Sequence, residues 1–331
     1  MSEALKRIEA VDVFRGIIVI KFLFSNALGS FTRESEIPFA LKHNQGNALL
    51  LSDFTAALFA FLIGIGLAIS YSRRIAKGQK LSEIFIAYAK RFGMLLVVGL
   101  ILDSVSYSKL TTQNPELIVA WGVLQTLAVA GAIAALTILF SNAIRIAIAL
   151  VILLVYGYLL LNNASFFDLI NKSLHGGPVG AISFGAISIF GLIAGSIVLQ
   201  KSEWQKLQKL SLIAIALFAL AMFVSTIIPF NKLLVTPSYS LITSAVGFAL
   251  MAIIYYMVEI KKVNSSIIKK FGANALFAWI IQYPLIYYPL GKLYKFQFAS
   301  FLEGMALSLA FVIVVYVLII FAEKKGIRLA L

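Results

Sequence analysis

Long runs of apolar residues alternate with short polar loops along the chain. Ten of these runs are about as long as the roughly 20 apolar residues that a helix needs to cross a bilayer. The strands of a membrane barrel would be about half as long. The pattern therefore predicts an all-α polytopic membrane protein, a bundle of about ten transmembrane helices at 11–30, 48–72, 83–107, 117–140, 143–161, 178–200, 209–228, 236–259, 270–291 and 301–322.

The composition agrees with a membrane protein. Apolar residues make up 61% of the chain and charged residues only 13%, the reverse of the balance in a soluble domain. No linker or low-complexity tract interrupts the sequence, so we expect a single transmembrane domain over residues 1–331. The first apolar segment carries Asp12, Arg15 and Lys21 and lacks a small-residue cleavage site, which argues against a signal peptide.

The net charge of +14 would suggest a nucleic-acid partner in a soluble protein. Here most lysines and arginines gather at the termini and in alternate loops, among them the loops at 73–80, 201–209 and 261–270. The positive-inside rule then predicts that both termini are cytoplasmic and that His43 and His175 lie on the outer side. Basic inner loops account for the charge, so we expect a lipid bilayer and no nucleic acid as partner. A homodimer is left open.

The chain contains no cysteine, which excludes disulfides, thiol nucleophiles and cysteine metal sites. Its two histidines are far apart in sequence and lack a matching pattern of carboxylates. We therefore expect no metal site.

Ionisable residues inside the first segment are costly, by about 2.5–3.5 kcal/mol at a helix centre, and such residues indicate either function or a structural ion pair. Asp12 and Arg15 are three residues apart, so they share a helix face and can pair. Arg15 and Asn26 are eleven residues apart, close to three full turns, and also face one way. Lys21 lies deeper and needs a partner.

Further polar residues inside the other segments outline a polar path through the bundle. Cationic residues lie at the expected cytoplasmic end of this path, and His43 lies near its outer end. The alternative interpretation of each is structural: an anchor at the membrane surface, an inter-helix hydrogen bond worth about 0.6 kcal/mol, or a solvated loop histidine. The residues are Asp53, Lys90, Arg91, Asp103, Gln125, Asn274 and Gln282.

Several stretches occur in an order that is similar to a known family. The opening "RIEAVDVFRGIIVI" contains Arg7, Asp12, Arg15 and Gly16 and is followed by Asn26; then come "LKHNQGN" with His43, "GVLQ", "FGLIAG", "NKLLVTPSY" and "GANALFAW". The chain thereby resembles the transmembrane acyltransferase family related to heparan-alpha-glucosaminide N-acetyltransferase. It departs from the family at Thr126, where many members have Arg, and at "HGGPVG", where many have an acidic motif.

The resemblance implies transfer of an acetyl group from cytoplasmic acetyl-CoA, the co-substrate, to the amino group of a glucosamine-like amino sugar on the outer side, without a metal. It implies that His43 is the general base, that Asn26 donates to the oxyanion and that Asp53 orients His43 or binds the acceptor. Direct transfer and an acetyl-histidine intermediate are both compatible with it. The remaining candidates are Asp12, Arg15, Lys21, Lys90, Arg91 and Gln125 for acetyl-CoA, and Asn231, Lys232, Ser238 and Asn274 for the acceptor.

Two alternative functions stay open. Surface-glycan O-acyltransferases have an Arg followed after ten residues by a catalytic His, whereas this chain has Arg15 followed by Asn26, which favours the N-acetyltransferase relatives. A proton-coupled or small-molecule transporter would also need charges inside the membrane, but the chain shows no clear internal repeat. Abundant Ile and Lys favour a prokaryote, and hence its plasma membrane. His175, beside two glycines, is interpreted as a loop residue.

Overall fold

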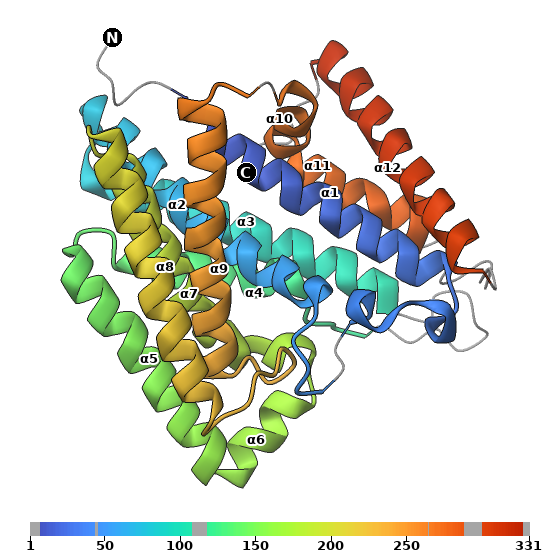
Figure 1. The fold of residues 1–331 in the computed structure, drawn as a ribbon, viewed down its shortest axis with the longest axis horizontal. Coiled ribbons are helices and arrows are strands. Elements are labelled where there is room, and N and C mark those ends of the chain that lie inside the picture. Colours follow the sequence, from blue (N-terminus) through green and yellow to red (C-terminus); the bar gives the residue numbers. More distant parts are fainter. Residues whose placement is uncertain (1–6, 44–45, 108–117, 264, 288–299, 327–331) are drawn as a thin grey trace.

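The computed structural model describes residues 7–43, 46–107, 118–263, 265–287 and 300–326 (Figure 1). Every regular element of these residues is a helix, which confirms the predicted all-α membrane bundle. Short 3-10 turns lie in the loops, and π-helical turns follow α9 and α11. The helices are α1 (Glu9–Phe31), α2 (Phe54–Ala76), α3 (Leu81–Tyr107), α4 (Val123–Leu136), α5 (Asn142–Asn162), α6 (Ala164–Asn171), α7 (Gly177–Val198), α8 (Glu203–Ser225), α9 (Pro237–Tyr255), α10 (Ser266–Ala273), α11 (Ala275–Gln282) and α12 (Phe301–Lys324).

Seven helices of the described residues are long and apolar enough to cross a membrane: those at α2, α3, α5, α7, α8, α9 and α12. The other predicted spans differ for local reasons. Helix α1 carries four charged residues, and α4 is only 14 residues long because it begins after Gly122 in an extended backbone. The predicted span 270–291 is interrupted at Asn274, whose backbone leaves the helical region, so α10 and α11 are separate helices.

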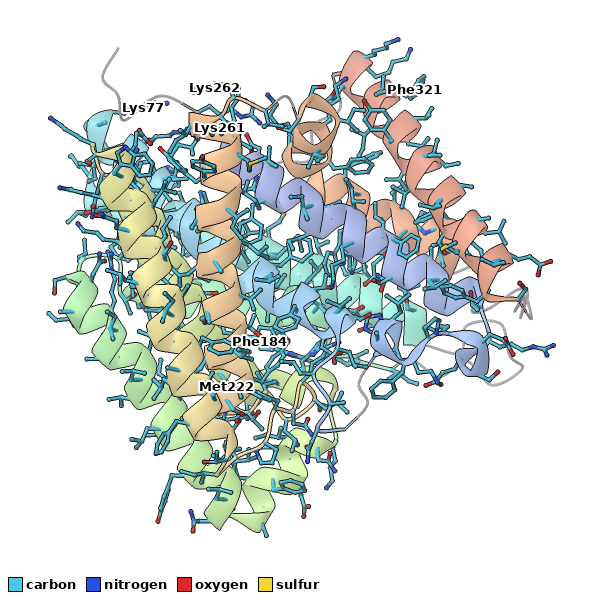
Figure 2. All side chains as sticks on the ribbon, viewed as in Figure 1. Lys77, Phe184, Met222, Lys261, Lys262 and Phe321 are labelled. Carbon is cyan, nitrogen blue, oxygen red and sulfur yellow. The ribbon has the colours of Figure 1, made fainter. Side chains whose placement is uncertain are left out.

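The outer surface of the bundle is apolar and its charges gather at the helix ends (Figure 2). Met222 and Phe321 point outward and are about half exposed, whereas Phe184 is fully buried in the interior. Lys77, Lys261 and Lys262 lie at one end of the bundle. Apolar flanks with a basic end are what a protein surrounded by lipid requires.

Helix α7 is the core of the bundle and packs against α2, α4, α5 and α9. It approaches α2 so closely that no side chain fits between the two backbones. A Cβ at Gly64 would lie 1.9 Å from the Ser188 carbonyl oxygen, and one at Gly191 would lie 1.9 Å from that of Phe61. Small residues at the contact allow this approach, as in other membrane bundles.

Helix α1 packs against α10 and α12 and also touches α2 and α9. A Cβ at Gly16 would meet the Ile268 carbonyl oxygen at 2.0 Å, and one at Gly272 would meet that of Asp12 at 1.9 Å. The close contact brings the carbonyl oxygen of Gly272 to 3.4 Å from Nη1 of Arg15. The Arg-Gly pair of the first helix is thus held against the interruption between α10 and α11.

The loop between α1 and α2 folds back over the start of α2 through three 3-10 turns. The Ser52 hydroxyl donates to the Leu41 carbonyl at 2.9 Å, and the Leu50 N–H donates to Oδ2 of Asp53 at 3.2 Å. These bonds tie the segment that carries His43 to the N-terminal end of α2.

Candidate functional site

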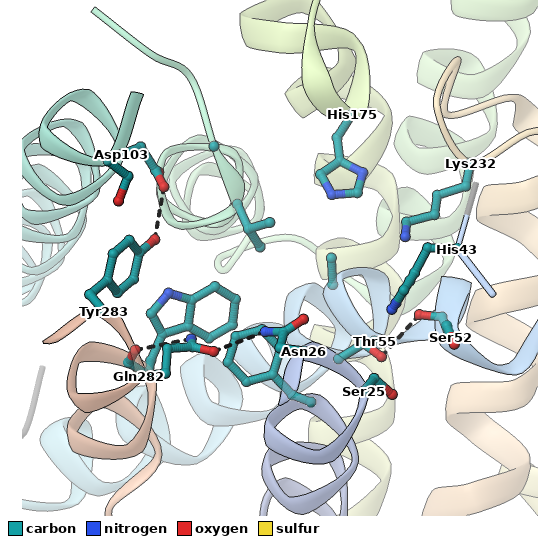
Figure 3. Close-up of a pocket in the computed structure, with 16 residues that line it drawn as sticks. Ser25, Asn26, His43, Ser52, Thr55, Asp103, His175, Lys232, Gln282 and Tyr283 are labelled. Carbon is teal, nitrogen blue, oxygen red and sulfur yellow. Dashed lines mark hydrogen bonds between the residues drawn. The ribbon is translucent and has the colours of Figure 1, made fainter. Parts of the chain in front are cut away.

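Both histidines of the chain line one cavity of about 420 Å³, which we name the histidine cavity (Figure 3). His43 comes from the α1–α2 loop, His175 from the turn before α7, and Lys232 from the loop between α8 and α9. Figure 3 shows the three side chains directed into the same space. The rest of the lining comprises Phe22, Ser25, Asn26, Ser52, Thr55, Ala56, Asp103, Ser106, Gly122, Val123, Trp279, Gln282 and Tyr283.

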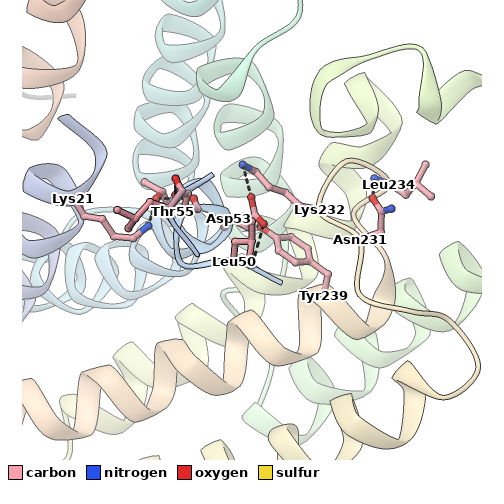
Figure 4. Close-up of polar contacts among 10 residues, drawn as sticks. Lys21, Leu50, Asp53, Thr55, Asn231, Lys232, Leu234 and Tyr239 are labelled. Carbon is pink, nitrogen blue, oxygen red and sulfur yellow. Dashed lines mark hydrogen bonds and ion pairs between the residues drawn. The ribbon is translucent and has the colours of Figure 1, made fainter. Parts of the chain in front are cut away.

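Lys232 of the histidine cavity forms a buried ion pair with Asp53 (Figure 4). Nζ of Lys232 is 3.3 Å from Oδ1 of Asp53, and Asp53 is fully buried. The Asp53 backbone carbonyl also accepts a 2.7 Å hydrogen bond from the Tyr239 hydroxyl. Next to the pair, Lys21 donates to Oγ1 of Thr55 at 2.5 Å. The deep lysine of the first helix therefore has a partner at the edge of the histidine cavity.

The two histidines are neutral at physiological pH. Burial, and then the positive charge of Lys232, lowers the pKa of His43 from 6.5 to about 4. The same two causes lower the pKa of His175 to about 3. Burial also lowers the pKa of Lys232 itself, opposed by Asp53. A neutral imidazole carries one unprotonated ring nitrogen, so His43 has the protonation state that a general base requires.

The sequence analysis missed His175 as a cavity residue. Its side chain is buried at 4% exposure, and its ring contacts Phe184 edge-on at 5.8 Å between centroids. Its backbone has a positive φ of 52°, which is uncommon for a residue with a side chain. The run of two glycines that follows could have signalled an unusual backbone at this position.

Amide and carboxylate side chains also line the histidine cavity. Nδ2 of Asn26 donates to Oε1 of Gln282 at 2.9 Å, and Gln282 donates in turn to the Trp279 carbonyl at 3.0 Å. The next residue, Tyr283, donates from its hydroxyl to Oδ1 of Asp103 at 2.8 Å. One amide hydrogen of Asn26 is thus already used within the protein.

A second cavity of about 730 Å³, the arginine cavity, is lined by several cations. Asp12 provides the carboxylate of this lining, at 2.5 Å from Nε of Arg7 and 3.5 Å from Nη1 of Arg15. The Asp12–Arg15 pair predicted from their spacing is therefore confirmed. Guanidinium groups bind phosphate oxygens in pairs, so the cavity has the chemistry of an anion site. Its cationic residues are Arg7, Arg15, Arg73, Arg74, Lys77 and Arg91.

The two cavities adjoin at Trp279, which lines both. Phe22, from the histidine cavity, stacks on Trp279 with ring centroids 4.0 Å apart. Phe59, from the arginine cavity, meets Trp279 edge-on at 5.5 Å. We name these three rings the aromatic wall. Its central ring, Trp279, lines both cavities.

The predicted site residues divide into three groups: those at the histidine cavity, those at the arginine cavity, and those outside both. His43, Asn26 and Lys232 line the histidine cavity, Asp53 pairs with Lys232 beside it, and Lys21 bonds to its lining residue Thr55. Asp12, Arg15 and Arg91 line the arginine cavity. The described lining of the two cavities does not include Lys90, Gln125, Asn231, Ser238 or Asn274.

The residues outside the cavities have structural surroundings. Lys90 is exposed, and Gln125 is buried with its amide on the Ala120 carbonyl. Asn231 holds its own loop by accepting from the Leu234 N–H. Asn274 donates to Oε1 of Glu323 at 2.9 Å, which ties the α10–α11 interruption to α12. Ser238 lies 3.1 Å from the Thr236 hydroxyl.

Together these features define a polytopic helical membrane protein with a cationic cavity next to a cavity lined by two buried histidines. The model of the family described as heparan-alpha-glucosaminide N-acetyltransferase, catalytic, matches residues 7–167. This match supports a relation of the chain to the family and a transmembrane acetyltransferase-like function. The match ends before His175 and Lys232, which complete the histidine cavity. No curated protein matches the chain.

Since the chain has only two histidines, their protonation can be followed directly by NMR of histidine-labelled protein in detergent. The unfolded chain should protonate both rings near pH 6.5, whereas the folded protein should keep both neutral from pH 8 down to 5.5. Because the unfolded state binds more protons, stability should fall as the pH drops below about 6.5.

Variants that remove one histidine at a time assign the two signals. A His43 signal that titrates with a midpoint near pH 6.5 in the folded protein would contradict the buried, neutral site.

Proposed function

We propose that the chain is a single transmembrane N-acetyltransferase domain. It moves an acetyl group from cytoplasmic acetyl-CoA to the amino group of a glucosamine-like sugar on the other side of the membrane. The observation that carries the proposal is the contact of the arginine cavity with the histidine cavity at Trp279. In this account the protein is an acyl-CoA-dependent enzyme of the prokaryotic plasma membrane, with both termini in the cytoplasm.

The arginine cavity is the site that we propose for the CoA moiety. CoA carries phosphate groups, and the cavity presents six cations against the carboxylate of Asp12. Because Asp12 already pairs with Arg7 and Arg15, we assign the phosphate contacts to other cations of the lining, and first to Arg91. The pantetheine arm would then lie along the aromatic wall and bring the thioester towards Asn26.

The histidine cavity is the site that we propose for the acceptor. His43, kept neutral by burial and by Lys232, takes a proton from the acceptor nitrogen as that nitrogen attacks the thioester carbonyl carbon. The C–N bond forms, the carbonyl oxygen becomes an oxyanion, and the C–S bond then breaks. The thiolate of CoA leaves and takes up the proton that His43 has accepted, so that the products are the amide and free CoA.

Asn26 and the Lys232–Asp53 pair support this step. The second amide hydrogen of Asn26 is the one that can donate to the oxyanion, since Gln282 holds the other. Lys232 adds a positive potential that favours the oxyanion and disfavours protonation of His43 in the ground state. Asp53 holds Lys232 in place from the start of α2.

The first test combines acetyl-CoA binding with CoA release in detergent-solubilised protein, with glucosamine as acceptor. His43→Ala should bind acetyl-CoA with unchanged affinity but lose the general base, and kcat should fall by about 10²–10⁴. Phe39→Ala, in the same loop but exposed, is the matched control and should keep wild-type kcat. The proposal is wrong if neither protein binds acetyl-CoA, or if His43→Ala turns over as fast as the control.

The donor site can be tested with neighbouring cations of α3. Arg91→Gln removes a charge from the arginine cavity, while Lys90→Gln removes one from the exposed face. Loss of one charge-assisted hydrogen bond should raise the KM for acetyl-CoA roughly tenfold in Arg91→Gln and leave it unchanged in Lys90→Gln.

S-acetylpantetheine, which lacks the phosphates, serves as the second substrate in this experiment. Its KM should be the same in both variants and in the wild type. An equal rise in KM for both substrates in Arg91→Gln would mean that the residue acts on the fold and not on the phosphates.

A further inference from the structure

The proposed mechanism gives no role to the buried imidazole of His175, which lines the histidine cavity. Its ring lines the cavity together with His43, yet none of the described residues forms a hydrogen bond with it. Buried polar groups in proteins are nearly always paired, so an imidazole at a cavity wall that bonds to none of the described residues is a candidate to bind a group that is not part of the chain.

The backbone conformation around His175 holds the ring at the histidine cavity. His175, Gly176 and Gly177 all have positive φ, at 52°, 71° and 60°. A Cβ at Gly180 would lie 2.1 Å from the His175 carbonyl oxygen, so only glycine allows α7 to approach the turn. Backbone conformations of this kind persist where the surroundings enforce them, and they cluster at functional sites.

The burial of one ring nitrogen indicates which tautomer His175 adopts. Nδ1 is sealed from solvent and has no hydrogen-bond partner. Buried N–H groups without a partner are rarer than buried acceptors without one, so we assign the lone pair to Nδ1 and the hydrogen to Nε2. His175 then presents an N–H donor to the histidine cavity.

The electrostatics of this end of the cavity suit an electron-rich ligand atom. Lys232 is positive, His43 and His175 are neutral, and the carboxylate of Asp53 is already paired with Lys232. A second cation would be repelled here, whereas a developing negative charge would be stabilised. After burial and Lys232, the charge of a protonated His43 also lowers the pKa of His175.

From this geometry we propose that His175 is a catalytic residue whose Nε2–H donates a hydrogen bond to the carbonyl oxygen of the transferred acetyl group. The inference rests on the proposed acetyl transfer. As the acceptor nitrogen bonds to the carbonyl carbon, the C=O electron pair moves to the oxygen, which His175 and Asn26 stabilise. The pair returns when the C–S bond breaks, and no proton leaves His175.

Three variants test the donor. His175→Phe keeps the ring and its contact with Phe184 but removes both nitrogens. His175→Gln keeps an amide N–H at nearly the reach of Nε2. His175→Asn tolerates the positive φ, but its amide ends at the reach of Nδ1. The readouts are kcat, the KM values for acetyl-CoA and glucosamine, and the melting temperature in detergent.

Loss of one oxyanion donor should lower kcat by about 10²–10³ in His175→Phe and His175→Asn, with both KM values near wild type. His175→Gln should recover most of this loss. Wild-type kcat in His175→Phe overturns the inference, and so does a rise in the KM for glucosamine without a change in kcat. The melting temperature and the acetyl-CoA affinity of each variant show whether it is folded. If His175→Phe is misfolded, the kcat of His175→Gln compared with the kcat of His175→Asn decides.

The outcomes separate this inference from the proposed function. If the wild type releases CoA and His43→Ala does not, while His175→Phe does, acetyl transfer stands and the role of His175 fails. If the wild type neither binds acetyl-CoA nor releases CoA, both fail together.

Discussion

The buried ion pair of Lys232 and Asp53 joins the three segments on which the histidine cavity depends. Asp53 stands at the start of α2 and fixes the end of the His43 loop through the Leu50 N–H. Lys232 belongs to the α8–α9 loop and faces the cavity. Removal of either partner would leave an uncompensated charge in the interior, which generally costs about 3–5 kcal/mol. The pair thus has a structural and an electrostatic role, because burial and then the charge of its lysine lower the pKa of both histidines.

The position of the polar groups separates two kinds of chemistry within one bundle. The arginine cavity is strongly cationic and suits phosphate, whereas the histidine cavity combines two neutral imidazoles with a paired lysine. Helix α1 contributes Arg15 to the first and Asn26 to the second, since the two residues are about three helical turns apart. The rings of the aromatic wall lie where the two cavities adjoin.

The sequence was sufficient for features that depend on periodicity and on neighbouring residues. The all-α membrane bundle followed from the length of the apolar runs, and the Asp12–Arg15 pair followed from its spacing of three. Features that depend on distant parts of the chain were not predictable in the same way. Lys90 and Arg91 are adjacent, but only Arg91 faces the arginine cavity. Asn274 looked like a residue inside a span, and it instead marks the break between α10 and α11.

His175 is the clearest example of what the sequence alone did not predict. A lone histidine next to two glycines is typical of a loop, and only the folded chain brings it to His43 across more than 130 residues of sequence. The backbone conformation that holds it there depends on the packing of Gly180 against the turn, a contact with no signature in hydrophobic periodicity.

The central claim, that donor and acceptor occupy connected sites reached from opposite sides of the membrane, is best tested in sealed vesicles. The protein would be reconstituted with acetyl-labelled acetyl-CoA on one side only and glucosamine on the other side only. We predict labelled N-acetylglucosamine on the glucosamine side and free CoA on the donor side, with the orientation of the protein determined by protease protection of its termini. Product formation only when both substrates share one side would contradict the account.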